Sequence, residues 1–188
     1  MSPRWTSAGW WRTNSRTSGS ATSSPTGPGI TSGFADWLEL VWTEHHLGRA
    51  EAELQARSYQ RGGVRAEDAS SRPVVWPDYT DPDEMFDGHS YQGAAARIRL
   101  LADELGQPLF QRCLTTYVAR HRDSLVTTDD LVAVFNEVSG RDLGRFFDEW
   151  FRGPGYPVVE ARVTADGSRL ELAQTQRQRG WREVFHVG

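Results

Sequence analysis

The sequence predicts a mainly α-helical fold that ends in a short β-hairpin. Apolar side chains recur at helical spacing from Phe34 to about residue 152, and after Gly153 the spacing becomes alternating. The residues before Phe34 contain no Asp or Glu, and most of them are Ser, Thr, Gly or Pro, a composition typical of disorder. The chain therefore divides into a disordered segment, a helical domain and the start of a β element, at residues 1–33, 34–153 and 154–188.

The helical part is expected to consist of several short helices. The first runs from Phe34 to about Leu47, and a more polar one covers 49–60. Residues 61–84 are rich in Gly, Pro and Asp, which predicts a loop. Thr127 or Thr128 is expected to cap a later helix, ahead of two acidic residues that suit a helix N-terminus. The later helices are predicted over 89–105, 107–122, 128–138 and 141–152.

The β-hairpin is predicted by apolar residues at alternating positions. They begin at Val158, and a second set begins at Leu170. Between the two sets lies Asp166-Gly167, a dipeptide typical of tight hairpin turns.

Composition excludes several classes of function. The 188 residues carry 25 acidic against 21 basic side chains, a net charge of −4, which argues against nucleic acid as a partner. No apolar run is long enough for a membrane span, and no signal peptide is recognisable, so the cytoplasm is the default expectation. The single cysteine, Cys113, excludes an internal disulfide and is expected to be a buried structural thiol.

Hydrolytic zinc sites usually need two histidines at a suitable spacing, and the sequence contains no H-E-x-x-H. His45 and His46 are adjacent, so on a helix they point about 100° apart and cannot share one ion. His89, His121 and His186 have no partner at a useful spacing. The residues alone therefore predict no metal site in this chain.

Four motifs nevertheless resemble those of the gluzincin aminopeptidases, zinc peptidases of the aminopeptidase N type. Residues 33–48 are similar to the helix that follows the L-N-E-G-F motif, and 90–94 (S-Y-Q-G-A) resembles S-Y-x-K-G-A without its lysine. Residues 139–151 resemble an S-G-x-D-L…F-F-D-x-W ending, and 155–157 resemble the G-x-P turn after it. The resemblance implies that the chain is the helical C-terminal half of a gluzincin catalytic domain.

The same resemblance implies a reaction and a cofactor. In the family, two histidines of H-E-x-x-H and the glutamate of L-N-E-G-F hold zinc, which activates a water molecule to attack a peptide substrate and release its N-terminal residue. A downstream tyrosine stabilises the oxyanion, and Tyr91 matches that position. Gly93 stands where the family has lysine, so this chain is one residue shorter there. Tyr91 is the only catalytic residue predicted here; no zinc is expected to bind.

Back-translation indicates that the zinc motif is encoded in another reading frame. GC-rich codons for V-V-A-H-E-L-A-H-Q-W-F-G-D, read one base late, encode residues 10–22, and codons for W-D-H-I-W encode residues 29–33. We therefore expect residues from about 10 to 33 to be a frameshifted zinc-motif region, with the frame restored at Phe34 and L-N-E-G lost before it.

Three functional hypotheses follow. The first is a peptidase-family fragment without activity, and the second is a helical module kept for binding. Loss of the zinc-motif helix is expected to expose apolar surface around Trp37, Leu38 and Val41, through which copies could self-associate. The third, weaker one is a hydrolase using the acidic pairs Asp129-Asp130 or Asp148-Glu149, although such charges are ordinary at helix starts.

Overall fold

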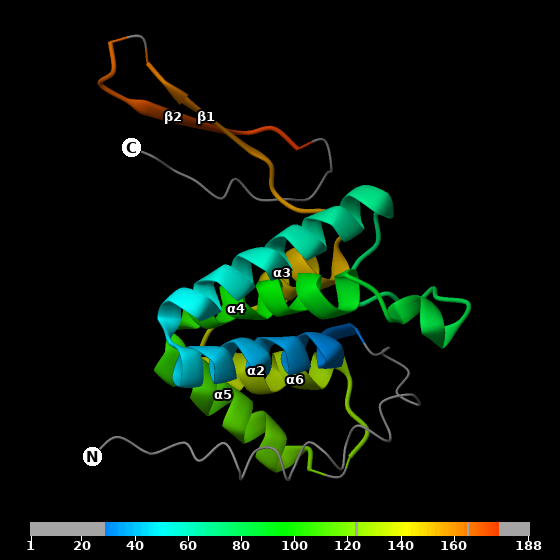
Figure 1. The fold of residues 1–188 in the computed structure, drawn as a ribbon. Helices are drawn as coiled ribbons and strands as arrows, with labels where there is room; N and C mark the ends of the chain where they lie inside the picture. The colour runs from blue at the N-terminus through cyan, green and yellow to red at the C-terminus, as the bar shows by residue number, and fades with distance from the viewer. Residues whose placement is uncertain (1–28, 123, 165, 177–188) are drawn as a thin grey trace.

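The computed structural model describes residues 29–122, 124–164 and 166–176, and these form a helical body followed by a two-stranded hairpin (Figure 1). The predicted mainly α fold with a C-terminal hairpin is confirmed. Residues 1–28, which the sequence assigns to the disordered, frameshifted segment, lie outside the described residues. No helix in the described part combines the length and apolarity needed to cross a bilayer.

Helix α2 (Gly29–Leu47) starts five residues before the predicted Phe34. The expectation that residues 29–33 are disordered is therefore wrong. Ile30 and Phe34 pack against the buried core, and Gly33 lets the helix approach Ala94 so closely that an added Cβ would lie 2.3 Å from the Ala94 Cβ. Burial of this face stabilises a first turn whose own residues favour a helix poorly.

Helix α3 (Arg49–Ala69) continues nine residues beyond its predicted end at Gln60, so the loop predicted over 61–84 begins only after Ala69. The misleading signal is Gly62-Gly63. These glycines serve close packing instead of a turn, because a Cβ on Gly63 would lie 2.8 Å from the Gly93 Cα. The rest of the expected loop contains one 3₁₀ turn, η2 (Pro82–Met85), which projects away from the helices in Figure 1.

The remaining helices follow the prediction closely. The π turn η3 (His89–Gly93) leads directly into α4 (Ala94–Leu105), and α5 (Gln107–Arg120) follows. Thr127 caps α6 (Thr128–Ser139) in a reciprocal capping box with Asp130. The helical body ends with α7 (Gly144–Phe147), which leads into a second π turn, η4 (Asp148–Arg152).

One buried core joins these helices. α2 packs on α3, α4 and η3, while α5 packs on α6. Trp37 is only 6% exposed and its ring lies 5.1 Å from the ring of Phe110. The expected exposure of Trp37 is therefore wrong, whereas Val41 and Trp42 on the same helix are 42% and 43% exposed. The other large buried members of this core are Ile98, Leu101, Leu131, Phe135, Phe147 and Phe151.

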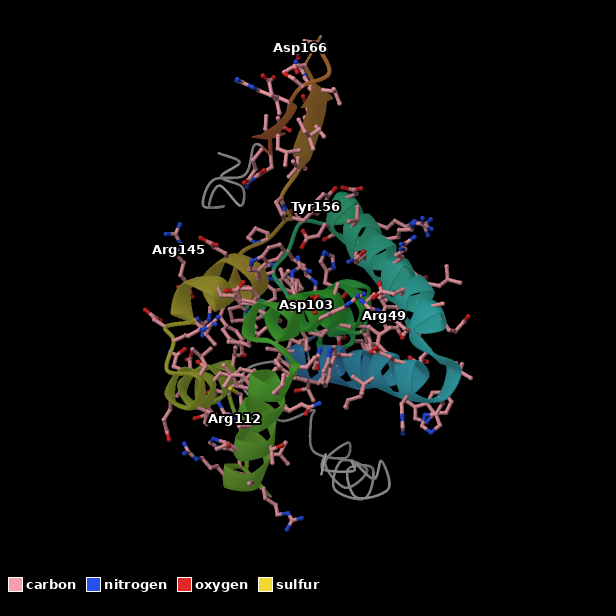
Figure 2. The ribbon with its side chains drawn as sticks, turned by 90° about the vertical axis from the view of Figure 1, so that its left-hand side faces the viewer. Arg49, Asp103, Arg112, Arg145, Tyr156 and Asp166 are labelled. Carbon is pink, nitrogen blue, oxygen red and sulfur yellow. The ribbon has the colours of Figure 1, made fainter. Side chains whose placement is uncertain are left out.

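The hairpin extends away from the helices. Strand β1 (Val159–Val163) pairs antiparallel with β2 (Leu170–Gln174), Val159 opposite Gln174 and Val163 opposite Leu170. Asp166, labelled in Figure 2, lies at the tip of the hairpin, and Gly167 has the positive φ of 71° that its place in the turn needs.

Candidate functional site

Tyr91 lies on the π turn η3, where the chain enters α4. The Gly93 N–H donates to the Gly88 carbonyl (2.8 Å), and the Tyr91 N–H donates to the Asp87 carbonyl (3.2 Å). The Tyr91 side chain is half-buried, with its ring 6.3 Å from the exposed ring of Phe86. Among the described residues we find no hydrogen-bond partner for its hydroxyl. The shortened S-Y-Q-G-A segment is thus a π turn that carries a half-buried tyrosine side chain.

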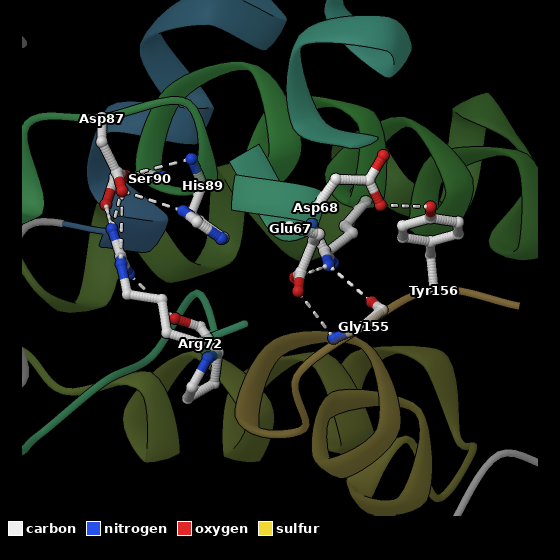
Figure 3. Close-up of polar contacts among 10 residues, drawn as sticks. Glu67, Asp68, Arg72, Asp87, His89, Ser90, Gly155 and Tyr156 are labelled. Atoms are coloured by element: carbon white, nitrogen blue, oxygen red, sulfur yellow. Dashed lines mark hydrogen bonds and ion pairs between the residues drawn. The ribbon is translucent and has the colours of Figure 1, made fainter. Parts of the chain in front are cut away.

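A buried polar network anchors the segment just before Tyr91 (Figure 3). Asp87 forms an ion pair with Arg72 and accepts a hydrogen bond from His89 Nδ1 (2.8 Å) and from the His89 N–H (3.0 Å). Arg72 also donates to the Ser90 hydroxyl (3.1 Å) and to the Pro73 carbonyl (2.9 Å). This network, which we call the Asp87 network, ties the start of η3 to the chain that follows α3.

Electrostatics within the Asp87 network favour an ionised carboxylate. Partial burial acts to raise the pKa of Asp87, but hydrogen bonds from His89 and Ser90 and the charge of Arg72 outweigh it, so the pKa falls below its ordinary value. Arg72 is 5% exposed and its guanidinium lies 5.2 Å from the centroid of the Trp76 ring. The network therefore holds the buried cation of Arg72 beside the carboxylate of Asp87, which His89 also contacts.

A second network joins the end of α3 to the Gly155-Tyr156 segment (Figure 3). Glu67 accepts from Arg97 (3.0 Å) and from the Gly155 N–H (2.9 Å), and Arg97 donates to the Gly155 carbonyl (3.0 Å). Burial lowers the pKa of Arg97, an effect that the charge of Glu67 offsets in part. The Tyr156 hydroxyl donates to Asp68 (2.8 Å). This Glu67 network secures the G-x-P turn against the helical body.

The described histidines do not assemble a metal site. His45 and His46 lie exposed near the end of α2, where their rings are 5.0 Å apart and His46 Nδ1 contacts the Trp42 carbonyl (2.9 Å). His121 follows α5, with its ring 5.1 Å from that of Tyr117. His186 lies outside the described residues. Within the described ranges, no group of three or more His, Cys, Asp or Glu side chains is placed to hold a metal ion.

The acidic pairs have structural partners. Asp130 belongs to the capping box of α6, and Asp129 pairs with Arg152. Asp148 also pairs with Arg152 (2.7 Å), and Glu149 pairs with Arg145 (2.7 Å). Cys113 is fully buried, as expected for a structural thiol. These contacts leave the third hypothesis, a carboxylate-based hydrolase, without a constellation to support it.

Sequence reasoning missed the Asp87 and Glu67 networks. Their long-range contacts, Arg72 with Asp87, Arg97 with Glu67 and Gly155 with Glu67, join residues 15 to 88 positions apart, so no local pattern predicts them. The one available signal was an arginine on the apolar face of a helix: Arg97 lies between Ala96 and Ile98 on the face that α4 buries. Such a residue needs a buried acidic partner.

Comparisons with known proteins agree with the motifs. The sequence pattern of the "Peptidase family M1 domain" matches residues 30–150. Aminopeptidase M1 of Arabidopsis thaliana is 31% identical over 150 residues, which are 78% of this chain and 17% of that protein. The tricorn protease-interacting factor F2 of Thermoplasma acidophilum is 32% identical over 123 residues, 64% of this chain and 16% of that protein. The chain thus spans less than a fifth of these relatives.

Solved structures show the same fold. An M1 zinc metallopeptidase from Deinococcus radiodurans, bound to a Tyr-Ser-Ala substrate, superposes with a TM-score of 0.60. The alignment covers 71% of this chain and 29% of that one, at 24% identity. From its sequence match over residues 30–150, supported by this fold, the chain belongs to peptidase family M1.

Proposed function

We propose that this chain is the helical second half of an M1 zinc-peptidase catalytic domain that keeps the tyrosine-bearing turn and lacks the zinc-binding motif. Two observations together support this proposal. Tyr91 lies on an anchored π turn, and the sequence contains no H-E-x-x-H. A zinc peptidase needs protein ligands for the ion and an open position for water. A tyrosine can stabilise an oxyanion, but it cannot generate the nucleophile.

α2 is continuous through Gly33-Phe34, the point at which this proposal places the loss of L-N-E-G. The end of the proposed out-of-frame segment therefore forms one helix with the residues of the restored frame.

In this proposal residues 10–33 are the out-of-frame remains of the zinc motif. Resequencing the genomic locus across codons 1–40 tests it directly. A disrupted frame is the expected result. One open frame that encodes H-E-x-x-H and L-N-E-G would show that the native protein carries the full zinc motif.

Protein chemistry gives a second test. The purified chain is expected to hold no stoichiometric zinc by mass spectrometry and to release no N-terminal residue from aminoacyl-coumarin substrates. A matched chain with the frame of residues 10–33 corrected and L-N-E-G restored should bind about one zinc ion. Zinc-dependent release by the uncorrected chain would refute the proposal.

A helical binding module is the second candidate, and the continuous core favours it. Trp37, Phe110 and Phe135 form one buried aromatic group across α2, α5 and α6. If the domain had lost a helix that covers its core, these aromatic side chains would be expected to be exposed. A single cooperative thermal transition would support a maintained domain, whereas non-cooperative melting with dye binding would favour a damaged remnant.

A further inference from the structure

A row of three arginines lies on the outer face of α3. Arg57, Arg61 and Arg65 are exposed and four residues apart, so they follow one another at intervals of about 6 Å along the helix. With Gln60 and Val64 they line a surface hollow of about 420 Å³. We call this surface the arginine hollow.

These three arginines have no carboxylate partner among the described residues, whereas many other arginines do. Arg72, Arg97 and Arg99, for example, each pair with an acidic side chain. Like charges four residues apart on a helix destabilise it by about 0.2–0.5 kcal/mol per pair. The fold therefore bears a small cost at the arginine hollow that an external anion would remove.

The same chain presents an unpaired acidic surface. Asp78, Asp81, Asp83 and Glu84 are all exposed on the loop around η2, which projects from the helices in Figure 1. Asp81 accepts from the Asp83 N–H (3.0 Å) and Glu84 from the Thr80 N–H (3.3 Å). Within the described ranges no arginine or histidine pairs with them. We call this segment the acidic loop.

We propose that the acidic loop of one copy of this chain binds in the arginine hollow of a second copy. Three positive charges face four negative ones, and this complementarity steers and orients association. Apolar groups accompany both surfaces, since Val64 in the hollow is 38% exposed and Phe86 beside the loop is 54% exposed. The contact is independent of zinc and of the proposed loss of peptidase activity.

Charge reversal tests the contact. Sedimentation velocity of the full chain at about 100 µM should show dimers or larger species in about 20 mM salt. In about 0.5 M salt it should show monomers, because charges more than a few ångströms apart are then screened from one another. The triple variant R57E/R61E/R65E and the quadruple variant D78K/D81K/D83K/E84K should each weaken self-association by about tenfold or more. An equimolar mixture of the two variants should associate again.

A matched control separates the contact from a change in net charge. The triple variant R112E/R122E/R169E changes the net charge by the same amount as R57E/R61E/R65E, but at exposed arginines elsewhere, and should associate like the wild type. Arg112 is labelled on α5 in Figure 2. Because every substituted side chain is exposed, circular dichroism should show an unchanged fold.

A wild-type chain that stays monomeric in low salt would overturn the proposal. If the arginine hollow of such a monomeric chain binds hexaglutamate through its arginines, the partner is another acidic protein.

Discussion

Gly33 on α2 and Ala94 at the start of α4 are in such close contact that position 33 has no room for a side chain. An added Cβ would lie 2.3 Å from the Ala94 Cβ and 2.9 Å from the Ala94 carbonyl carbon. This contact joins the N-terminal part of α2 to the end of the turn that carries Tyr91. The first residues of α2 are therefore packed against the rest of the helical body.

Replacing Gly33 by alanine should therefore destabilise the protein. Helix propensity alone would favour alanine by up to about 1 kcal/mol, but overpacking costs about 1–3 kcal/mol, so we expect a net loss. Urea unfolding measures the change. The double variant G33A/A94G should recover part of the loss, since it removes the clashing methyl group. Additive effects of the two substitutions would contradict the contact.

The Glu67 network should be the most sensitive polar site in the protein. Glu67→Gln leaves the buried Arg97 without its anion, which typically costs about 3–5 kcal/mol. Glu53→Gln provides a matched control, because Glu53 pairs with Arg99 at a partly exposed site (2.6 Å) and should cost at most about 1 kcal/mol. Urea unfolding measures the loss of unfolding free energy for both variants. Equal losses would show that burial does not determine how much each ion pair stabilises the protein.

Asp87→Asn should loosen the turn that carries Tyr91. The substitution removes the anion beside the buried Arg72 and should cost about 1–3 kcal/mol at neutral pH. Because the pKa of Asp87 is lowered in the folded state, its stabilisation is present above the unfolded value and is lost as pH falls through the folded value. The difference in the free energy of unfolding between wild type and D87N should therefore become smaller at acidic pH. Hydrogen exchange at residues 88–93 should quicken in D87N and stay unchanged in the surface variant E137Q.

Asp36 should make stability depend on pH in the opposite direction. Burial first, and the charge of Glu39 second, raise the pKa of Asp36 from 3.8 to about 6. The folded state then binds more protons than the unfolded state between about pH 4 and 6, so the free energy of unfolding should fall as pH rises through that range. Tyr59, on α3, also belongs to this group, since its hydroxyl donates to Glu39 (2.5 Å).

Asp36→Asn should remove this dependence. We expect a gain of about 1 kcal/mol at pH 7, after discounting for the half-exposed position of Asp36. Glu44→Gln, an exposed change on the same helix, should leave the profile as it is. Unfolding measured from pH 4 to 7 with parallel curves for wild type and D36N would count against the assignment.

Local sequence pattern determined much of this protein. Periodicity predicted the helices of 89–105 and 128–138. Thr127 or Thr128 was recognisable as a cap and Asp166-Gly167 as the hairpin turn, because each depends on residues within a few positions of one another. The ordered motifs from Phe34 onward predicted the peptidase family. The absence of H-E-x-x-H is likewise a property of the sequence alone.

Tertiary contacts decided the rest. Gly62-Gly63 predicted a loop and residues 29–33 a disordered stretch, but both segments are helical. Gly63 allows α3 to lie close against η3, and Gly33 allows α2 to lie close against α4. The ion pairs of Asp87 with Arg72 and of Glu67 with Arg97 depend on folding that brings distant residues together in a buried site. Local propensity is worth about 1 kcal/mol per glycine, and burial of a helix face outweighs it.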